Sequence, residues 1–141
     1  IMNGMDVTAD IRTPEISQKA SLIAAQPVVR EALLDMQREA ARQYDVVMDG
    51  RDIGTVVLPD ADVKVYLTAS VETRAKRRFL ELQEKGESAD LAKIAADIED
   101  RDYRDMHRDI SPLRQAEDAT LVDSSDMTID QVVERILELC R

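Results

Sequence analysis

The 141-residue sequence is poor in cysteine and histidine, and these shortages exclude several kinds of site. The one cysteine, Cys140, leaves no disulfide framework and no cysteine-based metal site. The one histidine, His107, gives little support to a Ser-His-Asp triad or a histidine-rich metal site. No apolar run approaches the roughly 20 residues of a membrane helix. A secretory signal pattern is also lacking, so the cytoplasm is the expected compartment.

Positive charge is scarce overall and is concentrated in two places. The net charge of −10 argues against binding to nucleic acids or membrane surfaces, which are both anionic. Within this acidic chain, basic residues cluster at Arg74, Lys76, Arg77 and Arg78, and again at Arg101, Arg104 and Arg108. Such clusters suit a small anion such as a nucleotide phosphate. For the first cluster, a solvated helix face with intrahelical ion pairs is an equal alternative.

Apolar periodicity and capping residues predict an alternation of helices and short buried strands. The predicted helices are 14–25 after the cap Thr13, a second from Pro27, 71–85 after the cap Ser70, 91–108, and 129–139 after a Thr128–Gln131 capping box. The predicted buried strands are 46–49, 63–68 and 120–123, and residues 6–11 are expected to be irregular or briefly extended. This order predicts an α/β fold in which helices cover a parallel sheet.

The segment VVMDGRDIGTVV at 46–57 gives the strongest indication of a site. Asp49 ends an apolar run, and ligands of open α/β sheets bind outside the carboxyl ends of the strands. Asp49 can hold a hydrated magnesium ion, Gly50 permits a close backbone approach, and Arg51 offers a planar fork for phosphate. A loop with a surface ion pair is the alternative.

The charged helix at 91–108 gives a second indication. Arg101, Asp105 and Arg108 are spaced by four and three residues, so they project from one face. Two guanidinium groups and a carboxylate suit a sugar hydroxyl and a phosphate. Alternatively, the face is simply solvated, and Asp102 and Asp109 pair with the arginines.

Residues 87–109 have the features of a closing lid. Gly86, Glu87 and Ser88 precede the charged helix, and Ser111-Pro112 follows it. A helical hairpin with flexible ends and a poorly buried charged tip is typical of a lid that closes over substrates.

The motifs together resemble bacterial cytidylate kinases, which phosphorylate CMP and dCMP. The resemblance covers nearly the whole chain, and the combination of IRTPE, DGRDIGTVV and RDxxRD is far more specific than a general nucleotide motif. The matching stretches are IRTPEISQKAS at 11–21, VVREALL at 28–34, MDGRDIGTVVLPDADVKVYLTAS at 48–70, RAKRR at 74–78, LQEKG at 82–86, DRDYRDMHRDISPL at 100–113 and LVDSSDMTIDQVVERIL at 121–137.

The resemblance implies a role for each site residue. The expected contacts to the cytosine ring come from Ser21, Arg30 and Asp52. Arg51 and Arg108 are expected to hold the CMP phosphate, and Arg101 and Asp105 to contact sugar and phosphate. Asp49 is expected to hold the magnesium ion through a water molecule. Arg77 and Arg78 are expected to be lid arginines near the phosphates of the donor ATP.

The resemblance also implies that part of the kinase is missing. Kinases of this class hold ATP with a glycine-rich loop ending in Gly-Lys-Ser or Gly-Lys-Thr, but no glycine of this chain precedes a lysine. We expect an incomplete nucleoside-monophosphate-kinase-like sheet without its first strand, which in the family lies between the strands matching 46–49 and 63–68. The implied parts are the C-terminal part of a helical CMP-binding insert at 1–43, a core at 44–86 and 110–141, and a lid at 87–109.

Other functions stay open at this point. The chain alone is expected to lack useful kinase activity and to pair with another copy or with the missing N-terminal part through exposed strand edges. The alternatives are a CMP-binding module without catalysis and an interaction domain with a decayed site. A hydrolase that uses Asp49 and Asp52 as a carboxylate pair is the weakest option.

Overall fold

The computed structural model describes residues 2–8 and 10–141, which form two compact units, Ile1–Met48 and Asp49–Arg141. We call them unit 1 and unit 2 and describe each by itself.

Unit 1 is helical. The 3₁₀ turn η1 (Asp10–Arg12) leads into α1 (Pro14–Ala24), which is followed by α2 (Pro27–Gln43). The Thr13 hydroxyl accepts a hydrogen bond from the Ile16 amide at 3.2 Å, so the predicted cap is confirmed. Both predicted helices are confirmed. Residues 6–8 are irregular as expected, Ala9 lies outside the described residues, and Asp10 and Ile11 belong instead to η1.

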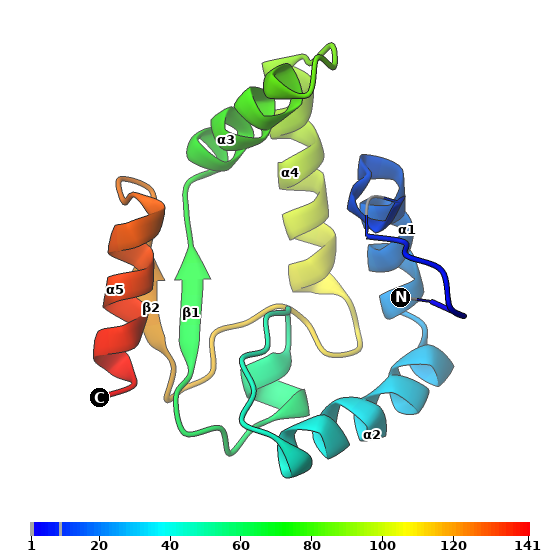
Figure 1. The fold of residues 1–141 in the computed structure, drawn as a ribbon, viewed down its shortest axis with the longest axis vertical. Coiled ribbons are helices and arrows are strands. Elements are labelled where there is room, and N and C mark those ends of the chain that lie inside the picture. Colours follow the sequence, from blue (N-terminus) through cyan, green and yellow to red (C-terminus); the bar gives the residue numbers. More distant parts are fainter. Residues whose placement is uncertain (1, 9) are drawn as a thin grey trace. The chain divides into compact units, whose positions relative to one another are not determined.

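Unit 2 contains the sheet and three helices (Figure 1). Its elements are the π-helical turn η2 (Ile53–Val57), β1 (Val65–Thr68), α3 (Val71–Glu84), α4 (Leu91–His107), β2 (Thr120–Asp123) and α5 (Ile129–Leu139). The predicted helices 71–85, 91–108 and 129–139 are confirmed to within one residue at their ends.

The sheet of the described chain consists of β1 and β2, which run parallel as predicted (Figure 1). Val65 pairs with Thr120 and Thr68 with Asp123, and the Ser124 amide continues the ladder by donating to the Thr68 carbonyl at 2.8 Å. The predicted strands 120–123 and 63–68 are confirmed, the latter beginning two residues later, at Val65.

The predicted strand at 46–49 is wrong. Residues 45–49 have no regular structure, and the Val47 side chain is fully exposed. A strand needs a backbone partner for its amides and carbonyls. No described segment pairs with 45–49, so apolar composition alone does not order it as a strand.

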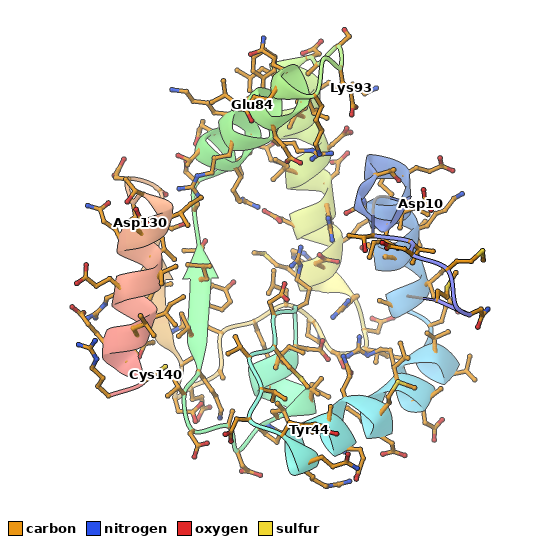
Figure 2. The ribbon with its side chains drawn as sticks, in the orientation of Figure 1. Asp10, Tyr44, Glu84, Lys93, Asp130 and Cys140 are labelled. Carbon is orange, nitrogen blue, oxygen red and sulfur yellow. The ribbon has the colours of Figure 1, made fainter. Side chains whose placement is uncertain are left out.

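The helices α3 and α4 pack against each other as a hairpin whose tip contains Glu84 and Lys93 (Figure 2). Gly86, at φ +74°, ends the first helix in a conformation that favours glycine. The Asp90 carboxylate caps the second by accepting from the Ala92 amide at 2.9 Å and the Lys93 amide at 3.1 Å. The one buried residue of α4 is the charged Asp105, so little of this helix belongs to the apolar core.

The buried apolar core is small. In the described residues it consists of Val57, Ala69, Ala75, Leu82 and Val122, all in unit 2. Large apolar side chains remain exposed on both strands and along α5, namely Leu67, Leu121, Ile129, Val133 and Leu137. None of the helices in the described parts of the chain combines the length and apolarity needed to cross a membrane.

Candidate functional site

The loop at 49–52 is held by the π-helical turn η2. The Asp52 carbonyl accepts hydrogen bonds from the Val56 amide at 2.9 Å and the Val57 amide at 3.2 Å. Val57 is fully buried, which anchors the turn in the core. The turn therefore fixes the backbone of Asp52 and, with it, the neighbouring Arg51.

Asp105, near the end of α4, is the centre of a charged cluster. Its Oδ2 atom accepts a hydrogen bond from Arg51 Nε at 2.9 Å, and Arg101 Nε lies 3.8 Å from the same oxygen. The residue is only 3% exposed. Its carbonyl accepts from the Leu113 amide at 2.7 Å, which ties the segment after α4 to the helix. The carboxylate thus brings together arginines from the 49–52 loop and from α4.

The electrostatic environment of Arg101 is unfavourable for its charge. Burial lowers the pKa of Arg101, and the positive charge of Arg51 lowers it further, while Asp105 acts in the opposite direction. An arginine remains charged at neutral pH despite such a shift. The site would therefore be stabilised by an additional negative charge.

Arg108 is the third arginine of the cluster. Its Nε donates to the Ser111 carbonyl at 2.7 Å, and Ser111 adopts the left-handed conformation at φ +50°. Its Nη2 lies 3.7 Å from Asp52 Oδ1, beyond hydrogen-bond distance. This buried nitrogen has no hydrogen-bond partner among the residues that the structure describes, so it is a donor to which an anion oxygen could bind.

The arrangement is suited to a phosphate. We call the five residues Arg51, Asp52, Arg101, Asp105 and Arg108 the arginine cluster. It has one guanidinium more than it has carboxylates. Guanidinium groups bind phosphate oxygens through paired, charge-assisted hydrogen bonds. A bound phosphate would balance the excess positive charge and accept from Arg108.

Asp49 fits a hydrated magnesium ion better than a dehydrated one. It is exposed at the start of unit 2, and no group of three or more metal-ligating side chains exists within 2–8 and 10–141. Magnesium usually keeps several waters and binds one or two carboxylates together with substrate phosphates. A single exposed carboxylate is compatible with that mode.

Arg77 and Arg78 differ in their surroundings. Arg77 Nη2 donates to the Ser124 carbonyl at 2.6 Å and to the Met127 carbonyl at 3.3 Å. Arg78 forms an intrahelical pair with Glu81 at 2.6 Å. Arg77 therefore joins α3 to the segment after β2, whereas Arg78 has the contact expected of a solvated helix face.

Ser21 and Arg30 belong to unit 1. Ser21 lies half-buried on α1, and Arg30 lies on the first turns of α2. Arg30 Nη1 donates to the Ala24 carbonyl at 3.2 Å, which links its side chain to the end of α1.

The sequence did not single out the ion pair between Arg74 and Asp102. Arg74 Nη2 lies 2.8 Å from Asp102 Oδ2, which joins α3 to α4. Arg74 was one member of a basic cluster, and pairing of Asp102 with an arginine was one alternative. Periodicity within either helix gives no signal for a pair between the two helices.

Comparison with known proteins places the chain in a family. A family model described as cytidylate kinase matches residues 1–141. The chain belongs to the cytidylate kinase family. It is 56% identical over 138 residues to the cytidylate kinase of Lactobacillus johnsonii, covering 98% of this chain and 60% of that protein. It is 54% identical over 137 residues to that of Desulfitobacterium hafniense, covering 97% and 59%. The chain therefore spans about three fifths of the length of these curated relatives.

Proposed function

We propose that this chain forms the CMP-binding part of a nucleoside monophosphate kinase, which transfers the γ-phosphoryl group of ATP to CMP or dCMP. The observation that carries the proposal is the arginine cluster, in which the buried Asp105 gathers Arg51 and Arg101 and Arg108 retains a buried donor nitrogen. Membership of the cytidylate kinase family supports the choice of acceptor.

The proposed roles are those that the resemblance to cytidylate kinases implies. Arg51 and Arg108 bind the CMP phosphate, and Arg101 and Asp105 contact its sugar and phosphate. Ser21, Arg30 and Asp52 recognise the cytosine ring. A polar base site rejects other bases because a wrong base leaves buried donors and acceptors unpaired.

The ATP side of the site involves three further residues of unit 2. Asp49 would hold magnesium through a water molecule, and Arg77 and Arg78 lie near the donor phosphates. When bound, magnesium neutralises charge on the phosphates of ATP. The proposal includes the division into a helical insert at 1–43, a core at 44–86 and 110–141, and a lid at 87–109.

Phosphoryl transfer requires positioning and charge neutralisation more than covalent chemistry. The attacking atom is already a phosphate oxygen, so no general base is needed. The arginine cluster would hold this oxygen in line and reduce the repulsion between two anionic substrates.

The 141-residue chain alone is proposed to lack useful kinase activity. No glycine precedes a lysine in the sequence, so the loop that cradles ATP phosphates is not among these residues. The test is a turnover assay of the purified chain with ATP, magnesium and CMP. A rate within about tenfold of the median enzyme turnover of about 10 per second would refute the proposed inactivity.

Residues 45–49 and the sheet are proposed to pair with a further strand, from the N-terminal part of the kinase or from a second copy. The exposed Val47, Leu67 and Leu121 support this proposal, because unpaired strands and apolar faces favour association. Light scattering tests it. Association that increases with concentration is expected, and a monomer at every concentration contradicts pairing between copies.

The alternative function is a CMP-binding module without catalysis. It is favoured by the assembly of the whole arginine cluster within unit 2. This alternative predicts a CMP affinity that ATP and magnesium leave unchanged. An affinity that increases when ATP and magnesium are added would instead favour the kinase.

A further inference from the structure

Arg74 connects the segment after β1 to α4, which carries two residues of the arginine cluster. Its Nε donates to the carbonyl of Ala69, which directly follows β1, at 2.9 Å. Its Nη2 lies 2.8 Å from Asp102 Oδ2 on α4. One guanidinium group therefore links the carboxyl end of β1 to the helix that carries Arg101 and Asp105.

The position of Asp102 on α4 makes this link consequential. Asp102 is the neighbour of Arg101 in sequence and precedes Asp105 by three residues, which is about one helical turn. Any rotation or sliding of α4 at Asp102 therefore also moves Arg101 and Asp105. Arg51 holds the same part of α4 through Asp105.

The Arg74–Asp102 pair is also more protected from water than an ordinary surface pair. The side chains of Arg74 and Asp102 are 34% and 22% exposed. By comparison, Arg135 and Glu138 on α5 form a pair in which both side chains are about half exposed. Exposed pairs contribute little because water and salt screen them, whereas a partly buried pair is screened less.

We propose that Arg74 is a positioning residue that acts through Asp102 to place Arg101 and Asp105 for the acceptor phosphate. This inference rests on the proposed function for the identity of its ligand. Arginine is suited to the task because its planar fork donates in two directions at once. A lysine has one compact ammonium group and cannot contact both the Ala69 carbonyl and the Asp102 carboxylate in the same geometry.

The test compares Arg74→Ala, Asp102→Asn and the double variant, with Arg135→Ala as the matched control. CMP affinity is measured by calorimetry, and the Nε–H resonance of Arg51 is followed by NMR without ligand. Each single change should weaken CMP binding by about three- to tenfold, and the double variant by no more than the larger single change. Both changes should shift the Arg51 resonance, and Arg135→Ala should change neither quantity.

Three results would overturn the proposal. The first is a folded Arg74→Ala variant with an unshifted Arg51 resonance. The second is a loss of CMP affinity in Arg74→Ala but not in Asp102→Asn, which would mean that Arg74 contacts the phosphate directly. The third is additivity of the two changes, which would mean that they act independently.

The experiment separates this inference from the proposed function. If the unaltered chain binds no CMP, the proposed binding function fails, and the Arg51 resonance still decides whether Arg74 positions the cluster. If Arg74→Ala does not fold, Arg74→Lys replaces it. Lysine keeps the charge and should restore the affinity and the resonance only in part, whereas complete restoration would show that charge alone is needed and would overturn the role of the fork.

Discussion

Replacement of Asp105 by asparagine tests how strongly the centre of the arginine cluster stabilises unit 2. The carboxylate of Asp105 lies 2.9 Å from Arg51 Nε and 3.8 Å from Arg101 Nε. At an effective dielectric constant of about 20, these distances correspond to gross attractions of about 6 and 4 kcal/mol. The substitution removes this attraction and keeps the size of the side chain.

The expected net loss is much smaller than the gross attraction. Burying the carboxylate costs several kcal/mol, and the two arginine side chains, 40% and 34% exposed, are partly screened by water. Asparagine also retains an oxygen that can accept from Arg51. We therefore expect Asp105→Asn to lower the free energy of unfolding of unit 2 by about 2 kcal/mol.

The assay is urea unfolding followed by circular dichroism, with hydrogen exchange of the α4 amides to report on unit 2 itself. The control is Glu138→Gln, which removes an exposed carboxylate and should change the free energy of unfolding by about 0.5 kcal/mol or less. Inorganic phosphate should recover part of the Asp105→Asn loss, because it supplies negative charge to the freed arginines. A loss no larger than that of the control would refute the reasoning.

Three further changes test other parts of the structure. Arg108→Lys removes the fork that reaches both Ser111 and Asp52, so CMP affinity measured by calorimetry should fall about tenfold; unchanged affinity would contradict this role. Ser111→Val places a branched side chain at φ +50° and should cost about 1–2 kcal/mol in urea unfolding, whereas Ser111→Gly, as control, should cost less than Ser111→Val. Hydrogen bonds from Lys85 and then Arg78 lower the pKa of Glu81 to about 2, so its contribution to stability is present above pH 4.5 and is lost as the pH falls towards 2. Thermal stability should therefore fall less between these two pH values in Glu81→Gln than in the unaltered chain. The same pH profile in both proteins would count against the two hydrogen bonds.

Elements fixed by nearby residues could be predicted from the sequence. The capping box before α5 is an example, because both of its hydrogen bonds join residues three apart. The Gln131 amide donates to the Thr128 hydroxyl at 3.2 Å, and the Thr128 amide donates to the Gln131 side chain at 2.9 Å. The caps Thr13 and Ser70 were predictable for the same reason.

Features that depend on distant segments were harder to predict. Residues 46–49 have a strand-like composition, but a strand also requires a partner, and composition carries no information about whether one is present. Spacing on α4 placed Arg101 near Asp105, whereas the bond from Arg51 to Asp105 joins residues 54 apart. That grouping was implied only by resemblance to a family. The Arg74–Asp102 pair was not singled out, because neither helix by itself indicates which of its charged residues faces the other helix.

A calorimetric titration of the chain with CMP, beside AMP and UMP and without ATP, tests the central claim most directly. The claim predicts that CMP binds and that AMP and UMP bind more weakly, because the arginine cluster holds the phosphate while Ser21, Arg30 and Asp52 read the base. Equal affinity for the three nucleotides would contradict the base-reading residues. Absence of binding to all three would contradict the proposal that these residues form a working CMP site in this chain.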